Sequence, residues 1–214
     1  MGDDGGMSEA ILFDLDRTLI DLQSFTDYGA ARREAEALVT GFEGLEVPPT
    51  DWSADTVAAM ALLVACSGDP RWALVSEAIE SHELAAIPQS TPMPECARAW
   101  RLSEGMPRAV VTLLPERVVR EVLAQHALTT DGLVIVGRRA DQRPKPHPDG
   151  LLSACAQLGV APGEALMIGD SAWDLEAARA AGCAFVGVPT QAGNLPPGTL
   201  VAADVAAAVR VALV

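Results

Sequence analysis

The sequence predicts an α/β fold: a Rossmann-like parallel sheet with helices on both faces and a small helical cap inserted after the first strand. Two observations lead to this prediction. From about residue 90 onward, short aliphatic and β-branched runs alternate with helical patterns, which is typical of parallel strands joined by crossover helices. Between residues 22 and 90, three helical patterns follow one another without a strand. We therefore expect a core domain at residues 8–21 and 91–214, and a cap domain at residues 22–90.

Five short segments are expected to form the sheet. Each is apolar at successive positions, as in strands that are covered by helices on both faces. In chain order they are "AILFDL" at 10–15, "RAVVTL" at 108–113, "LVIV" at 133–136, "ALMI" at 165–168 and "AFVGV" at 184–188.

The helices of the core are predicted from apolar periodicity and from residues that favour helix ends. They span residues 115–128, 148–158, 171–181 and 204–213. Gly159 and Gly182 follow two of them as expected left-handed C-caps, and Asp204 is the expected N-cap of the last. The insert carries three further helical patterns at residues 26–39, 53–66 and 70–87, separated by segments rich in glycine and proline.

Composition excludes several classes of partner. A net charge of -14 disfavours binding to nucleic acid or to an anionic membrane surface, because both need basic patches. The most apolar stretch, residues 57–66, is about half the roughly 20 residues that a membrane span requires. The four cysteines lack the paired spacing of a zinc site, and no signal peptide is recognised, so we expect a cytoplasmic protein with reduced thiols. A monomer and a homodimer are both compatible with the sequence.

Polar side chains follow three of the predicted strands. Asp14 and Asp16 end the first, Thr112 ends the second, and Asp170 and Asp174 follow the fourth. Because reactive groups in open parallel sheets lie beyond the carboxyl ends of the strands, we expect these side chains to converge.

A single lysine distinguishes the segment before the second core helix. Lys145 lies between two prolines in "RPKPHPDG", whereas the other fourteen of the fifteen basic residues are arginines. Clustered carboxylates need a compensating cation, and a set of oxygen ligands suits Mg²⁺ rather than zinc. A carboxylate beside such a cation and a lysine can attack phosphorus and form an aspartyl-phosphate.

Four motifs together resemble a known family. "DLDRT", Thr112 after a strand, Lys145 in "KPHPDGLL", and "GDSAWDLEAARAAG" match in order and spacing the motifs of the haloacid dehalogenase-like hydrolase superfamily. The resemblance is closest to its capped, phosphoglycolate phosphatase-like branch. It implies Mg²⁺-dependent hydrolysis of a small phosphorylated metabolite through an aspartyl-phosphate intermediate.

The resemblance also implies roles for individual residues. Asp14 would be the nucleophile, and Asp16 the acid that protonates the leaving alcohol and later the base for water. Thr112 and Lys145 would bind phosphoryl oxygens. Dehalogenases lack the second acid, so Asp16 favours phosphate ester hydrolysis.

The implied metal site contains four aspartates: Asp14, Asp16, Asp170 and Asp174. Asp16 would contribute its backbone carbonyl. Asp174 would orient Lys145 or a metal-bound water, although it is equally suited to a structural role in the first turn of a helix.

Two positions depart from the family pattern and keep alternatives open. Arg17 replaces a usual glycine, and Leu113 replaces a small or amide residue. A phosphotransferase or mutase, and a catalytically silent relative that binds a ligand, remain as alternatives. Thr18 is interpreted as a cap of backbone amides, Ser171 as a helix N-cap, and Arg138 as part of a solvated loop. The resemblance implies, from their location alone, that five residues of the insert face the substrate: Tyr28, Arg32, Arg33, Phe42 and Glu43.

Overall fold

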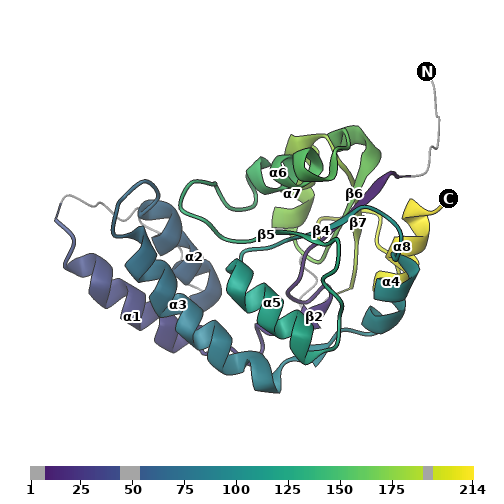
Figure 1. Ribbon diagram of the computed structural model, residues 1–214. Coiled ribbons are helices and arrows are strands. Elements are labelled where there is room, and N and C mark those ends of the chain that lie inside the picture. The colour runs from purple at the N-terminus through teal and green to yellow at the C-terminus, as the bar shows by residue number, and fades with distance from the viewer. Residues whose placement is uncertain (1–7, 44–53, 190–194) are drawn as a thin grey trace.

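The computed structural model describes residues 8–43, 54–189 and 195–214. A five-stranded parallel sheet forms its centre (Figure 1). The strands lie in the order β5 (Val134–Val136), β4 (Arg108–Val111), β1 (Ala10–Phe13), β6 (Ala165–Gly169) and β7 (Ala184–Gly187). The predicted parallel α/β fold is therefore confirmed, and the ends of β4, β1 and β6 lie side by side.

Helices cover both faces of the sheet. Alternate residues of β1 point to opposite faces: Ile11 and Phe13 belong to one apolar cluster, and Ala10 and Leu12 to the other. The first cluster is completed by α4 (Cys96–Leu102), α5 (Glu116–Gln125) and α8 (Val205–Ala212). The second is completed by α6 (Asp149–Leu158) and α7 (Ala172–Ala181).

The predicted helix ends are confirmed where the sequence carries a strong signal. Gly159 and Gly182 adopt φ angles of 73° and 81°, the left-handed conformation that ends a helix. The side chains of Ser171 and Asp204 accept hydrogen bonds from the backbone N–H groups of Asp174 and Ala207, so both are N-caps.

The described part of the insert contains three helices with an apolar cluster of their own. These are α1 (Tyr28–Thr40), α2 (Asp55–Ala65) and α3 (Trp72–Ala86), and they lie together at one end of the molecule (Figure 1). The insert cluster comprises Tyr28, Ala31, Ala35, Val39, Ala59, Met60, Leu62, Leu63, Cys66, Val75 and Ile79. Much of the predicted connection between the first two helices falls outside the described residues.

Several short elements were not predicted. Strands β2 (Ile20–Asp21) and β3 (Thr91–Pro92) pair antiparallel where the chain leaves and rejoins the sheet domain. Two-residue strands carry no periodicity, and the seven-residue α4 is too short for a clear apolar stripe. Single 3-10 turns occur at Ile87–Gln89 and Pro162–Glu164. None of the helices described here has the length and apolar character to cross a membrane.

Candidate active site

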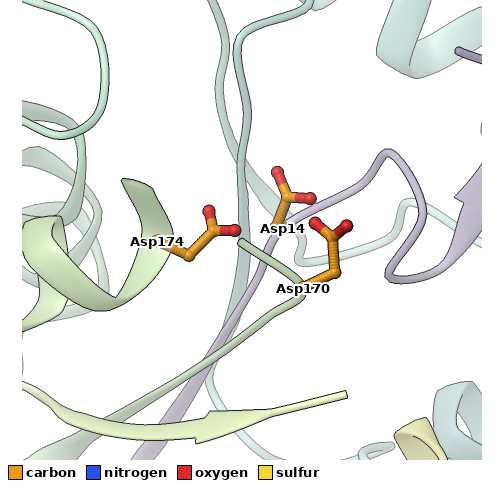
Figure 2. A group of neighbouring side chains, drawn as sticks. All are labelled: Asp14, Asp170 and Asp174. Atoms are coloured by element: carbon orange, nitrogen blue, oxygen red, sulfur yellow. The ribbon is translucent and has the colours of Figure 1, made fainter. Parts of the chain in front are cut away.

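Three buried aspartates meet at the carboxyl edge of the sheet. Asp14 directly follows β1, Asp170 follows β6, and Asp174 lies in the first turn of α7. Figure 2 shows the three carboxylates gathered from these elements, and each offers an oxygen within 4.8 Å of the others. The close approach of β6 and α7 needs Gly169, because a Cβ atom there would lie 2.5 Å from the Cβ of Asp174.

Lys145 lies against this cluster and is also buried. Its Nζ donates to Oδ1 of Asp14 at 2.6 Å, to Oδ1 of Asp174 at 2.5 Å and to the backbone oxygen of Val111 at 3.1 Å. Burial opposes the charged ammonium, yet the two carboxylates raise the pKa of Lys145 above its ordinary value. The structure therefore holds a fixed positive charge beside Asp14.

Asp174 has a structural role as well as a contact with Lys145. Its Oδ2 accepts hydrogen bonds from the backbone N–H and the hydroxyl of Ser171, at 3.1 and 2.5 Å, in a capping box. The two roles considered for Asp174 from the sequence therefore coexist, one on each carboxylate oxygen.

Asp170 differs from its two neighbours because no described residue donates a hydrogen bond to its carboxylate. Burial, followed by the negative charge of Asp174, raises the pKa of Asp170 to about 7. Burial likewise raises the pKa of Asp14, against the opposing charge of Lys145. Three carboxylates face one ammonium, and all ligand atoms are oxygens. This donor set fits a hard divalent cation such as Mg²⁺, which Asp14 and Asp170 would hold.

Asp16 points to a different part of the site. Its Oδ1 accepts hydrogen bonds from the backbone N–H groups of Leu22 and Gln23, both at 3.0 Å. Burial nevertheless raises its pKa to about 6. The carboxylate of Asp16 is not one of the three clustered groups, so its predicted part in a metal site rests on its backbone carbonyl alone.

The two residues that follow Asp16 adopt unexpected roles. The hydroxyl of buried Thr18 donates to Oδ2 of Asp14 at 3.3 Å, so the interpretation of Thr18 as a cap of backbone amides was wrong. Arg17 has a φ angle of 62°, in the left-handed region that favours glycine. The left-handed conformation explains why glycine suits this position in the family. The side chain of Arg17 lies at the edge of the site.

A cavity of about 550 Å³ joins these groups to the insert. We call it the catalytic cavity. Its core wall includes Asp14, Asp16, Thr112, Lys145 and Asp170. Its wall from the insert consists of Gln23, Tyr28, Ala54, Thr56, Val57 and Met60.

Of the five insert residues expected to face the substrate, Tyr28 lines the catalytic cavity. Arg32 instead forms an ion pair with Asp55 at 3.0 Å, and Phe42 packs against the insert cluster. The contribution of the first turns of α2 was missed. The strongly apolar residues 57–66 indicated only a buried helix, because a sequence pattern does not show which end of a helix faces a cavity.

A buried ion pair connects the core to the insert. Nη1 and Nη2 of Arg138, just after β5, donate to Oε1 and Oε2 of Glu83 in α3 at 3.0 and 3.1 Å. The two side chains are 4% and 0% exposed. Tyr28 donates its hydroxyl to Oε1 of Glu83 at 3.2 Å, and Arg138 also donates to the backbone oxygens of Ser76 and Leu113. The interpretation of Arg138 as part of a solvated loop was therefore wrong.

Apolar contacts from the core reinforce this connection. The half-buried side chains of Leu113 and Trp173 pack against the insert cluster. Leu113, one of the two departures from the family pattern, thus provides an apolar contact beneath the inserted helices.

A parallel sheet with a helical insert after its first strand, and with aspartates, a threonine and a lysine at its carboxyl edge, defines a class of hydrolases. The family model of the haloacid dehalogenase-like hydrolases matches residues 9–182, and the chain belongs to this family. The resemblance identified from the four motifs is therefore confirmed.

Curated relatives point to one branch of the family. The chain is 32% identical over 197 residues to a phosphoglycolate phosphatase of Pseudomonas putida, covering 86% of this chain and 70% of that protein. It is 38% identical over 86 residues to a phosphoglycolate phosphatase of Escherichia coli, but this match spans only 40% of the chain and 34% of that relative.

Solved structures share the fold. A hydrolase from Pseudomonas syringae superposes with a TM-score of 0.69 at 23% identity, and CbbY from Rhodobacter sphaeroides in complex with phosphate with a TM-score of 0.68 at 20% identity. Each comparison covers 94% of this chain and 96% of the other.

Proposed function

We propose that this protein is a Mg²⁺-dependent phosphatase that hydrolyses a small phosphorylated metabolite through an aspartyl-phosphate on Asp14. The observation that carries the proposal is the contact of 2.6 Å between Lys145 and Asp14, with Asp170 and Asp174 beside them at the floor of a cavity. The similarity to phosphoglycolate phosphatases along most of the chain supports it.

Asp14 is oriented for nucleophilic attack. Lys145 holds one carboxylate oxygen and Thr18 contacts the other. In the first step an oxygen of Asp14 bonds to phosphorus, the ester P–O bond breaks, and the leaving oxygen takes a proton from Asp16. In the second step Asp16 removes a proton from water, which attacks phosphorus and releases inorganic phosphate and the free carboxylate of Asp14.

Thr112 and Lys145 stabilise the transferred group in different ways. The hydroxyl oxygen of Thr112 accepts a hydrogen bond from the backbone N–H of Leu114 at 3.3 Å, so its own proton is available to a phosphoryl oxygen. Lys145 directs its three N–H bonds to protein oxygens and therefore acts mainly through its charge. Mg²⁺ bound by Asp14 and Asp170 would neutralise the negative charge that develops on the phosphoryl oxygens.

The inserted helices at residues 22–90 are proposed to act as a cap domain. Tyr28 and the first turns of α2 line the catalytic cavity opposite the aspartates, so they are placed to contact the substrate and to exclude water. We place the enzyme in the cytoplasm, since its four cysteines are free and buried.

The test is phosphate release from p-nitrophenyl phosphate and a panel of small phosphorylated metabolites, with Mg²⁺ or with EDTA. We expect turnover that needs Mg²⁺ and that is lost in Asp14→Asn. An added alcohol acceptor distinguishes a phosphatase from a phosphotransferase. Absence of turnover by the folded wild-type protein in Mg²⁺ would contradict the proposal.

A further inference from the structure

A second cavity lies on the other side of Lys145. It has a volume of about 220 Å³ and lies between the insert and the segment that joins β5 to α6, which reaches toward the inserted helices in Figure 1. We call it the side chamber. Its lining residues from the insert are Met60, Leu63, Val64, Ser67 and Trp72.

The wall of the side chamber is largely apolar. Val111 and Val136 face the insert residues from the sheet. Trp72 donates its indole N–H to the backbone oxygen of Leu63 at 3.1 Å, so this polar atom is satisfied and the ring contributes apolar surface. An apolar cavity of about 150 Å³ can hold a benzene molecule, so the side chamber has room for one ring or a short branched chain.

The side chamber adjoins the proposed phosphoryl site. Thr112 and Lys145, the two residues that would stabilise the phosphoryl group, line both the side chamber and the catalytic cavity. Met60 also lines both. A phosphate ester held at Asp14 therefore has the side chamber as a neighbouring space for its organic group.

The side chamber is poorly suited to a second anionic group. Four of its five basic side chains are already paired with carboxylates: Arg138 with Glu83, Arg139 with Asp141, Arg143 with Asp149, and Lys145 with Asp14 and Asp174. The fifth is His147. A carboxylate placed there would lose water without gaining an unpaired arginine or lysine in the described wall.

We propose that the side chamber binds the organic group of the substrate, and that this group is uncharged and largely apolar. The proposal refines the phosphatase function above and rests on it. The proposal predicts that the enzyme prefers such a substrate to phosphoglycolate, whose organic group carries a carboxylate.

Binding tests the side chamber without requiring turnover. Methylphosphonate and phenylphosphonate carry the same charged group and cannot be hydrolysed. We expect calorimetry with Mg²⁺ to show that phenylphosphonate binds the wild-type protein at least about tenfold more tightly, as burial of several carbon atoms allows. Equal affinities would overturn the proposal.

A substitution that fills the side chamber with a large side chain, called the plug variant, provides the matched comparison. Val64 is 49% exposed on α2 and lines the chamber, so Val64→Trp fills it from the surface. We expect the preference for phenylphosphonate to fall to near unity with methylphosphonate binding unchanged. Leu74→Trp, at a 51% exposed position of α3 that does not line the chamber, should keep the preference. If Val64→Trp misfolds, Ser67→Phe replaces it. An unchanged preference in a folded plug variant would overturn the proposal.

If the protein prefers phenylphosphonate but hydrolyses no phosphate ester, the side chamber binds an organic group as proposed and the phosphatase function is contradicted. The failure of one proposal can therefore be told apart from the failure of the other.

Discussion

Two buried ion clusters of this protein have opposite charge balance. At the sheet edge, Lys145 is the one ammonium among the carboxylates of Asp14, Asp170 and Asp174. Between core and insert, Arg138 faces the single carboxylate of Glu83, and both side chains are almost fully buried. The first cluster carries an excess of negative charge, and the second is neutral.

The difference distinguishes a buried charged cluster that can bind a ligand from one that only connects two parts of the protein. Arg138 and Glu83 bond through the two terminal guanidinium nitrogens, and Tyr28 and Ser76 complete their hydrogen bonds, so this cluster has no need of a ligand. Asp170 accepts no hydrogen bond from the described residues, and burial together with the negative charge of Asp174 raises its pKa to about 7. The unbalanced cluster is therefore the one that a cation and a phosphate group can complete.

Loss of Lys145 should produce the largest effect. Lys145→Met leaves Asp14 and Asp174 without their cation, so we expect activity to fall by about a hundredfold to a thousandfold and the free energy of unfolding by roughly 3 kcal/mol. Phosphate release and urea unfolding measure both. The control is Arg117→Met, which breaks an exposed pair with Glu121 and should change neither quantity appreciably. Full activity in Lys145→Met would refute the role given to this charge.

Loss of Arg138 should mainly affect stability. Arg138→Met leaves Glu83 buried and unpaired, at an expected cost of roughly 3 to 5 kcal/mol in the free energy of unfolding. The double variant Arg138→Met with Glu83→Leu should recover most of this loss, because it removes both charges. Urea unfolding of the wild-type protein and of these two variants measures the recovery. If the double variant is as unstable as the single one, the pair of Arg138 and Glu83 is not the charge-balanced connection between core and insert described here.

Loss of Asp170 should stabilise the protein in the absence of metal, whereas loss of Arg138 should destabilise it. Asp170→Asn removes one of the repelling carboxylates, so we expect the free energy of unfolding in EDTA to rise by about 1 kcal/mol. In Mg²⁺ the variant should show little further stabilisation, because a ligand is missing. Thermal unfolding with and without Mg²⁺ checks both expectations, and a lower stability in EDTA would argue against repulsion at this site.

Replacement of Arg17 should produce the smallest effect. Arg17→Gly relieves a left-handed backbone conformation and should raise the free energy of unfolding by about 1 kcal/mol. It also removes a positive charge from the edge of the catalytic cavity, so we expect KM for a phosphate ester to rise a few-fold with kcat retained. A large loss of kcat would instead assign Arg17 a direct part in the reaction.

The sequence predicts well which residues gather at the carboxyl edge of the sheet. It predicts poorly which residues connect the core to the insert. Asp14, Thr112 and Asp170 were predicted to converge because strand ends in a parallel sheet share one edge, whatever the details of packing. The pair of Arg138 and Glu83 joins residues 55 positions apart, and it depends on how α3 lies against the core. Neither a periodic pattern nor a motif encodes that contact.

Local partners of the site were missed for a related reason. The hydroxyl of Thr18 has several possible acceptors within its own turn, and only the folded turn directs it to Asp14. The left-handed conformation at Arg17 was hidden as well, because arginine carries no signal for it and the family glycine was the sole indication.

The central claim is that the three aspartates form a site completed by a divalent cation. Calorimetric titration of Mg²⁺ into the wild-type protein and into Asp170→Asn tests it most directly. We predict one Mg²⁺ per chain in the wild-type protein and a loss of binding in the variant, with circular dichroism showing that both are folded. Equal Mg²⁺ binding by the two proteins, or none by the wild-type protein, would contradict the account.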